Sequence, residues 1–416
     1  MLNNSIAIKI RKLAFSPICV RLLTVALSFI SNILIHRSLG LELKGQYTTI
    51  LNYANFFQLL LNCGICYAYP LFRKDMGEIK AKETLLTIIS LQTMLFGGIS
   101  IIIIFFSLSI KLTAILLLSV AMICNSQIVF VALIDNIKTR NVMLLLSTVF
   151  YIVLNLLAIV FYPGNLYVIV ILLILKNMFE SLLCGTKNHY FVFVKSSLSW
   201  RILQRALHIG VPTAVFAVLI SCNYNITIFM LNWMDAGDLQ IGVFGVAYTL
   251  STMLWILPDA FKELIYNKTA NKEDHRFVLK CIKLNILVSV VVCGGFALLG
   301  KWFLGFVYGS EFSVAFDVTL TLFIGIVPMV VFKLVHPIYV NAGRSSVVIC
   351  LLSISVVINI CLSFFLIPKY GAYGAAIASV ISYCACGALF FWRFYQDYYR
   401  NSKPSTGSRK QMEVRK

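Results

Sequence analysis

Twelve long apolar runs constrain the fold of this chain more than any other feature. They lie near residues 18–35, 46–71, 84–108, 112–134, 142–162, 166–184, 208–231, 242–265, 282–300, 318–342, 345–366 and 371–391. A helix needs about 20 mainly apolar residues to cross a hydrocarbon core roughly 30 Å thick, and the runs repeatedly meet that length. Because the alternating pattern of barrel strands is missing from the sequence, the runs predict an all-α integral membrane protein with about twelve transmembrane helices.

Composition supports a membrane environment. The chain has 416 residues, of which 60% are hydrophobic and 12% are charged, and its net charge is +19. So few charged residues cannot coat a soluble globule of this length. The excess of positive charge is explained by basic loops beside anionic lipid headgroups, so we expect no nucleic-acid partner.

An internal repeat divides the runs into two halves of six. The stretch SLGLELKGQY, between the first two runs, has a counterpart near mid-chain, DAGDLQIGVF, in which Gly237 and Gly242 align with Gly40 and Gly45. One glycine of each pair is expected to end a helix, and the other to let the next helix begin in close contact. A second echo relates YPGNLY to IPKYGAYG at nearly the same offset. Repeats of this kind are common in secondary transporters.

The halves predict four parts along the chain. These are an N-terminal six-helix bundle (1–186), a cytoplasmic amphipathic linker (187–207), a C-terminal six-helix bundle (208–392) and a basic cytoplasmic tail (393–416) that we expect to be disordered.

The distribution of lysine and arginine predicts the orientation of the chain in the membrane. With the N-terminus inside, 28 of the 35 fall in cytoplasmic segments, five fall outside and two lie within spans. Both termini are therefore predicted to be cytoplasmic.

Motifs for covalent chemistry are missing. The pairs Cys63 and Cys66, and Cys384 and Cys386, lie in apolar runs, where cysteine acts as a small hydrophobe, and neither has matching metal ligands nearby in sequence. The sequence contains no GxxxxGK[ST] phosphate loop. The predicted outer loops are too short to build a glycosyl-transfer or polymerase site. We therefore expect neither an enzyme nor a bound metal or cofactor.

Polar residues inside the runs are the candidate site residues, because each is costly in hydrocarbon unless it faces protein or water. Asn52, Asn55 and Asn62 fall near one face of the second span. This stripe either lines a cavity or bonds neighbouring helices. Lys176 and Glu180, one turn apart on the sixth span, either form a self-neutralising pair or serve the transported molecule.

Lys333 and His336 stand out within the tenth span. Neither has a carboxylate within one helical turn, and Pro328 and Pro337 are expected to interrupt the helix on both sides. An unpaired cation beside freed backbone groups is typical of a polar transport path. A distant partner such as Glu180 or Asp259 is the alternative. Asp259 itself lies toward the cytoplasmic end of the eighth span.

Three stretches carry a family resemblance. These are SLGLELKGQY, NAGRSS at Asn341–Ser346 and, above all, LIPKYGAYGAAIAS at Leu366–Ser379. They resemble the polysaccharide-exporter branch of the multidrug/oligosaccharidyl-lipid/polysaccharide (MOP) superfamily, nearest to the Wzx-type O-antigen flippases. The resemblance covers the whole pattern of spans. It implies two six-helix bundles in a MATE-like inverted V around a central cavity, in the bacterial inner membrane.

The same resemblance implies a function. Such proteins move O-antigen units linked to undecaprenyl pyrophosphate from the cytoplasmic to the periplasmic leaflet during lipopolysaccharide biosynthesis, beside other O-antigen assembly proteins. The alternatives are a MATE-type cation or drug antiporter and, from another class, a membrane glycosyltransferase or O-antigen polymerase. An antiporter would be expected to place carboxylates without lysine in its lumen.

Candidate roles follow from these positions. A lipid pyrophosphate needs a wet, cationic cavity with hydrogen-bonding and aromatic walls. We expect Lys333 to be the principal phosphate contact, with Lys176 assisting, Arg21 guiding entry, and Asn55 and Asn62 lining the cavity. For coupling to a proton or sodium gradient, the titratable candidates are Glu180, Asp259 and His336.

Overall fold

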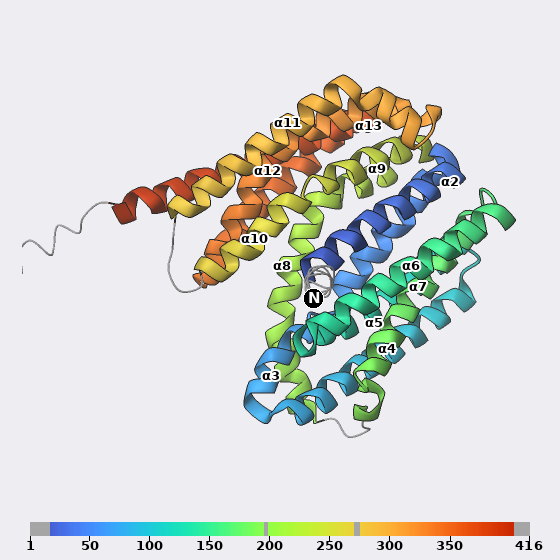
Figure 1. Ribbon diagram of the computed structural model, residues 1–416, viewed down its shortest axis with the longest axis vertical. Coiled ribbons are helices and arrows are strands. Elements are labelled where there is room, and N and C mark those ends of the chain that lie inside the picture. The colour runs from blue at the N-terminus through green and yellow to red at the C-terminus, as the bar shows by residue number, and fades with distance from the viewer. Residues whose placement is uncertain (1–16, 195–198, 270–274, 403–416) are drawn as a thin grey trace, which may run out of the picture. The chain divides into compact units, whose positions relative to one another are not determined.

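The computed structural model describes residues 17–194, 199–269 and 275–402, and this part of the chain is built from helices without strands (Figure 1). The predicted all-α class is confirmed. The α-helices are α2 (Pro17–Leu61), α3 (Tyr69–Met76), α4 (Glu78–Phe106), α5 (Ile110–Asp135), α6 (Ile137–Phe161), α7 (Leu166–Lys187), α8 (Trp200–Trp233), α9 (Asp238–Met253), α10 (Ile256–Thr269), α11 (His275–Val307), α12 (Phe316–Asn341) and α13 (Ser345–Ser402). Three short 3-10 helices are η1 (Ile65–Ala68), η2 (Tyr190–Phe193) and η3 (Ser310–Ala315).

The number of spans agrees with the apolar runs. Within the described ranges, nine helices are long and apolar enough to cross a membrane, or ten if the bent pair α9 and α10 is one span. Two of the nine, Leu23–Met76 and Ser345–Asp397, have 54 and 53 residues. Each contains a glycine with non-helical backbone angles, Gly40 or Gly371. Because each is long enough for two crossings, the total comes to about twelve.

The described chain forms two compact units. The first holds the described residues up to Ser221 together with Gly237–Gly242 and Gly305–Phe312. The second holds Cys222–Ala236, Val243–Leu304 and the described residues from Ser313 onward. Helix α8 passes from one unit to the other between Ser221 and Cys222, beyond the connection predicted at 187–207. The predicted four-part division stays a prediction.

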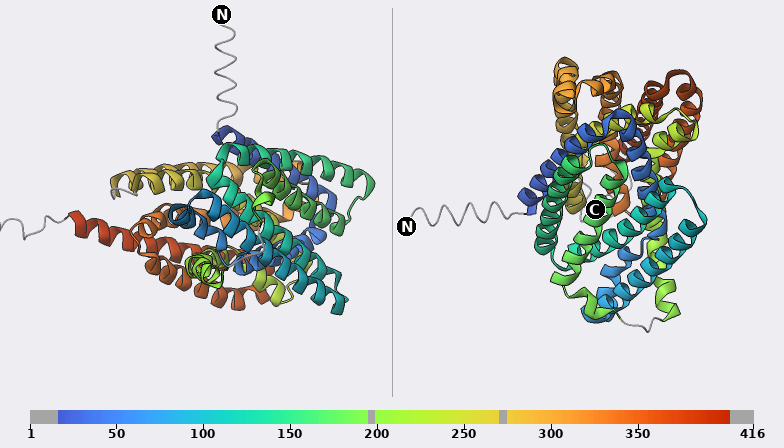
Figure 2. Two further views of the ribbon diagram at one scale, coloured as in Figure 1. Left: turned by 90° about the horizontal axis from the view of Figure 1, so that it is seen from below. Right: turned by 90° about the vertical axis from the view of Figure 1, so that its right-hand side faces the viewer.

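Helices α2 and α4 to α7 make up most of the first unit, and the blue-to-green ribbons of Figure 2 run alongside one another there. Helix α7 packs against α5 and α6, and α2 packs against α5 and α6. Two apolar clusters hold these helices together. One centres on α2 residues such as Ile35 and Ile50, and the other on Phe72, Leu85 and Val131.

The glycine repeat of the sequence forms a close helix crossing in the first unit. Gly40 has a φ of 72° within α2, and Gly237 has a φ of 85° just before α9. A side-chain carbon on Gly45 would overlap the carbonyl of Asp238, and one on Gly242 would overlap the carbonyl of Leu41. Each glycine therefore admits the backbone of the other helix. Gly40 breaks α2 as expected, but the close contact that Gly45 allows is with α9 and not with the adjacent span of its own half.

Helix α12 is the most buried span of the second unit, with buried residues from Val318 to Tyr339, and it packs against α13. Helix α8 is joined to α13 by fully buried hydrogen bonds. The Thr227 hydroxyl donates to Asn359 Oδ1 (3.0 Å) and lies 2.8 Å from the Ser379 hydroxyl, while the Ser355 hydroxyl donates to Asn223 Oδ1 (2.7 Å). Polar pairs of this kind hold membrane helices in register.

The glycine crossing yields a stability prediction. Gly45→Ala should lower the free energy of unfolding by about 1–3 kcal/mol, because the added methyl group overlaps backbone rather than a movable side chain. Gly98→Ala on α4 is the matched control, since a side-chain carbon there meets nothing within 4 Å. The control should be neutral or slightly stabilising. Thermal unfolding of the purified protein in detergent measures both, and equal midpoints would disprove the close crossing.

Candidate functional site

A broken span lies at the centre of the candidate site in the second unit. Helix α9 ends at Met253 and α10 begins at Ile256, with a bend of 42° between them. Pro258 explains the break, because it has no N–H to donate to the carbonyl of Leu254 one turn earlier. Backbone freed in this way at membrane depth is found where it is buried in protein or lines a water-filled cavity.

An ion pair joins this broken span to α12. Lys333 Nζ donates to Asp259 Oδ1 at 2.8 Å. The Lys333 side chain is 8% exposed, whereas the Asp259 side chain is 35% exposed. The pair therefore consists of a buried cation and a partly exposed carboxylate.

Two aromatic rings surround the same ammonium group. Lys333 Nζ lies 4.6 Å from the centre of the Trp255 ring and 5.5 Å from that of Tyr224. The two rings pack on each other with centroids 4.3 Å apart. Cation–π contacts stabilise a desolvated ammonium by about 2 kcal/mol. Lys333, Asp259, Trp255 and Tyr224 together are called the Lys333 site below.

One donor at the Lys333 site has no partner in the described part of the chain. Trp255 Nε1 is buried, and it makes no hydrogen bond there. A buried indole N–H without an acceptor lowers the stability of the fold. Such a group is available to donate a hydrogen bond to a ligand. Lys333 Nζ therefore lies over the ring of an indole whose N–H has no acceptor in the described part of the chain.

Of the two interpretations of Lys333, the structure supports the alternative. Lys333 is not an unpaired cation, because Asp259, 74 residues away in the sequence, pairs with it. Pro328 and Pro337 do not interrupt α12 either, since both lie inside one continuous helix. His336 is buried, with Nδ1 3.0 Å from the Phe332 carbonyl oxygen. The break that exposes backbone lies in α9 and α10 instead.

A second charged pair lies in the first unit. Lys176 Nζ contacts Glu180 Oε2 at 2.6 Å, and the Ser147 hydroxyl donates to the same oxygen at 3.0 Å. The Glu180 side chain is 3% exposed. The self-neutralising pair considered from the sequence therefore forms.

Lys176 also lines a cavity of about 280 Å³ that has both apolar and polar residues in its wall. Tyr47, Tyr151, Thr148 and Asn177 contribute hydroxyl and amide groups to its wall. The cavity thus combines one cation with several neutral hydrogen-bonding groups, a combination that suits an anion or a sugar hydroxyl.

The remaining predicted residues do not gather into one site. Asn52 and Asn62 are buried, but Asn55 is exposed, so the asparagine stripe does not share one environment. Arg21 lies on α2, and its side chain is outside the described part of the structure. Among the described residues, no cluster of three or more His, Cys, Asp and Glu could hold a metal ion.

Sequence reasoning missed Trp255 and Tyr224. Both lie in apolar runs, where an aromatic residue gives no sign of facing a charge. The stretch WILPD, which places Trp255 three residues before Pro258 and four before Asp259, was the one available signal. A proline followed by a carboxylate inside an apolar run indicates a broken span.

Solved structures share this fold. A multidrug-resistance MATE family transporter of the MOP superfamily, in an inward-facing conformation, matches with a TM-score of 0.70 at 15% identity over 91% of this chain and 96% of that chain. The lipid II flippase MurJ, in an inward closed conformation, matches with a TM-score of 0.74 at 13% identity over 91% and 87%. A MOP superfamily transporter from Pyrococcus furiosus matches with a TM-score of 0.53 at 12% identity over 92% and 94%.

These likenesses establish the fold. The chain is a multi-pass membrane protein with the fold of the MATE and MurJ transporters of the MOP superfamily. No protein-family model matches the sequence, and no curated protein does.

The unequal burial of the Lys333 pair predicts unequal mutational effects. Asp259→Ala leaves a buried ammonium without its counter-ion and should cost about 3 kcal/mol of stability. Lys333→Met leaves a carboxylate that can be hydrated, and should cost about 1 kcal/mol. The double variant Lys333→Met/Asp259→Asn should be more stable than Asp259→Ala. Thermal unfolding in detergent tests the order, and a larger loss for Lys333→Met than for Asp259→Ala would contradict this account.

Proposed function

We propose that this protein is a flippase for undecaprenyl-pyrophosphate-linked O-antigen repeat units, which it moves from the cytoplasmic to the periplasmic leaflet of the bacterial inner membrane. The observation that carries the proposal is the Lys333 site. There a buried ammonium, two aromatic faces and an unbonded indole N–H meet at a broken span. The fold is shared with a lipid II flippase, which also handles a lipid-linked substrate.

Counter-ion exchange is the proposed mode of binding. Asp259 neutralises Lys333 while the site is empty, and its 35% exposure allows it to move aside. A pyrophosphate oxygen then takes the place of the carboxylate at the ammonium, and Trp255 Nε1 donates to the same anion. The rings of Trp255 and Tyr224 offer apolar faces to a sugar. Lys176 and its hydroxyl-lined cavity form a second polar surface, in the first unit.

The orientation proposed from the charge asymmetry has both termini in the cytoplasm. The headgroup then enters from the inner leaflet, and alternating access exposes the same site to the periplasm. Weaker positive potential on that side favours release.

A MATE-type cation or drug antiporter is the second candidate. The observation in its favour is the fold shared with multidrug transporters, together with the buried carboxylate of Glu180. The carboxylates of Glu180 and Asp259 are each paired with a lysine, however, which opposes binding of a cation. A transport assay with both substrate classes separates the two candidates.

The transport prediction concerns Lys333. In proteoliposomes that contain a fluorescent lipid-linked oligosaccharide, Lys333→Glu should abolish flipping, while Lys333→Arg should retain much of it. Loss of one charge-assisted hydrogen bond of about 1.5–3 kcal/mol corresponds to a loss of roughly tenfold or more in affinity. The double variant Lys333→Met/Asp259→Asn should therefore also be inactive, although it leaves no buried charge without a counter-ion. Flipping at the wild-type rate by this double variant, or by Lys333→Ala, would disprove the role.

Coupling to an ion gradient is proposed through Glu180, Asp259 and His336. Collapsing the proton and sodium gradients should slow flipping by the wild-type protein. Glu180→Gln should remove that dependence, because the amide cannot exchange a proton. Glu42→Gln is the control, since Glu42 is exposed on α2. A wild-type rate that is unchanged with both gradients collapsed would exclude coupling.

A further inference from the structure

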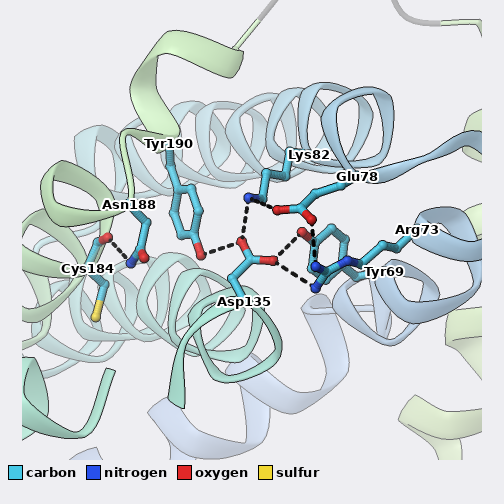
Figure 3. Close-up of polar contacts among 8 residues, drawn as sticks. All are labelled: Tyr69, Arg73, Glu78, Lys82, Asp135, Cys184, Asn188 and Tyr190. Carbon is cyan, nitrogen blue, oxygen red and sulfur yellow. Dashed lines mark hydrogen bonds and ion pairs between the residues drawn. The ribbon is translucent and has the colours of Figure 1, made fainter. Parts of the chain in front are cut away.

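A ring of four ion pairs joins α3, α4 and α5 in the first unit (Figure 3). Arg73 contacts Glu78 at 2.6 Å and Asp135 at 3.4 Å. Lys82 contacts Glu78 at 2.7 Å and Asp135 at 3.3 Å. Positive and negative groups alternate around the ring, and their charges cancel.

The two carboxylates of the ring differ in how firmly they are held. The Asp135 side chain is 6% exposed, and it accepts hydrogen bonds from the hydroxyls of Tyr69 (2.6 Å) and Tyr190 (2.9 Å). Burial and the nearby Asp135 charge raise the pKa of the Tyr190 hydroxyl, so that it stays a donor. Glu78, by contrast, is 47% exposed. Asp135 is therefore a fixed part of the ring, whereas Glu78 is replaceable.

The Glu78 carboxylate contacts the two cations of the ring in the way that a phosphodiester group could. One of its oxygens contacts Arg73 and the other contacts Lys82. A phosphodiester likewise offers two oxygens that share a single negative charge, and arginine binds phosphate well in this geometry. Exchange of Glu78 for a phosphodiester leaves the ring neutral, whereas a pyrophosphate would bring excess negative charge.

An apolar groove of about 440 Å³ lies in the same unit, within the size range of ligand pockets. It is lined by residues of α4, α5, α7 and η2, among them Thr93, Gly97, Ala121, Ile128, Met178 and Phe191. The side chains of Met178 and Phe191 are exposed, so the groove opens at the surface of the unit.

The groove and the ring lie along the same helix faces. On α4, Lys82 and Thr93 are three turns apart, and on α5, Ile128 and Asp135 are two turns apart, which corresponds to about 16 Å and 10 Å along the helix axes. Helix η2 also connects them, because Tyr190 donates to Asp135 while the next residue, Phe191, lines the groove. A single molecule with a phosphate and a long alkyl chain can occupy both.

We propose that this face of the first unit binds an anionic phospholipid of the bilayer. Its phosphodiester displaces Glu78 and lies between Arg73 and Lys82, and one acyl chain lies in the groove between α4, α5 and α7. This lipid site is distinct from the Lys333 site. In the proposed orientation it faces the cytoplasmic leaflet, where anionic lipids attract basic segments.

Lipid binding to the purified full-length protein tests the proposal, with native mass spectrometry and titration of dioleoyl phosphatidylglycerol. The wild-type protein should bind phosphatidylglycerol at lower concentration than phosphatidylcholine. Glu78→Gln should increase the affinity for phosphatidylglycerol about threefold or more, since it weakens the competitor for both cations. A purely structural ring predicts no gain. Arg73→Gln/Lys82→Gln should abolish the preference for phosphatidylglycerol.

A pair of adjacent glycines tests the groove. Gly97→Leu should fill it and weaken binding, whereas Gly98→Leu should leave binding unchanged, because a side chain there meets open space. The proposal fails if Glu78→Gln weakens or does not alter phosphatidylglycerol binding, or if both leucine variants behave alike. It also fails if inorganic phosphate competes as well as the lipid, which would indicate a site for free anions. The measurement involves no transport, so its outcome does not depend on the proposed function.

Discussion

Polar side chains inside the spans have no bulk water to bind, and the need to pair them across helices determines which helix faces meet. In the first unit, Asn125 on α5 donates to Asn177 on α7 at 3.0 Å. In the second, Thr227 on α8 meets Asn359 on α13. Such bonds contribute about 0.6 kcal/mol each on average, so they select the register more than they supply stability.

The Lys333 site differs from these structural polar contacts, because it keeps groups that lower stability. A lysine at this depth could be replaced by a similarly sized apolar residue without loss of packing, and buried ion pairs replaced in that way are often neutral or more stable. The site also keeps an unbonded indole N–H and a broken helix, each of which costs stability. Three costly features in one place are typical of a ligand site rather than of a structural contact.

Local signals in the sequence predicted most of the fold. The spans were predicted because hydropathy needs only neighbouring residues. The Lys176–Glu180 pair was one of two alternatives considered, because its members lie one helical turn apart. The repeat predicted glycine breaks between adjacent spans, but not that Gly45 and Gly242 would each contact the other's helix. The sequence offered Asp259 only as one of two distant partners for Lys333, because the two residues are 74 positions apart and only packing brings α10 to α12. The expected helix breaks at Pro328 and Pro337 were wrong for a related reason, because neighbouring helices can satisfy the carbonyls that a proline frees.

The proposed substrate site and the proposed lipid site share one electrostatic arrangement. In each, a cation is neutralised by a carboxylate that is partly exposed, Asp259 at 35% and Glu78 at 47%. A phosphate that enters replaces the carboxylate as the counter-ion of the cation, so the cation is not left without a counter-ion before binding or after release. A cation held without such a carboxylate would bind phosphate more tightly but would release it slowly. For a flippase, whose ligand must leave on the far side, the replaceable carboxylate is therefore the feature that makes binding reversible.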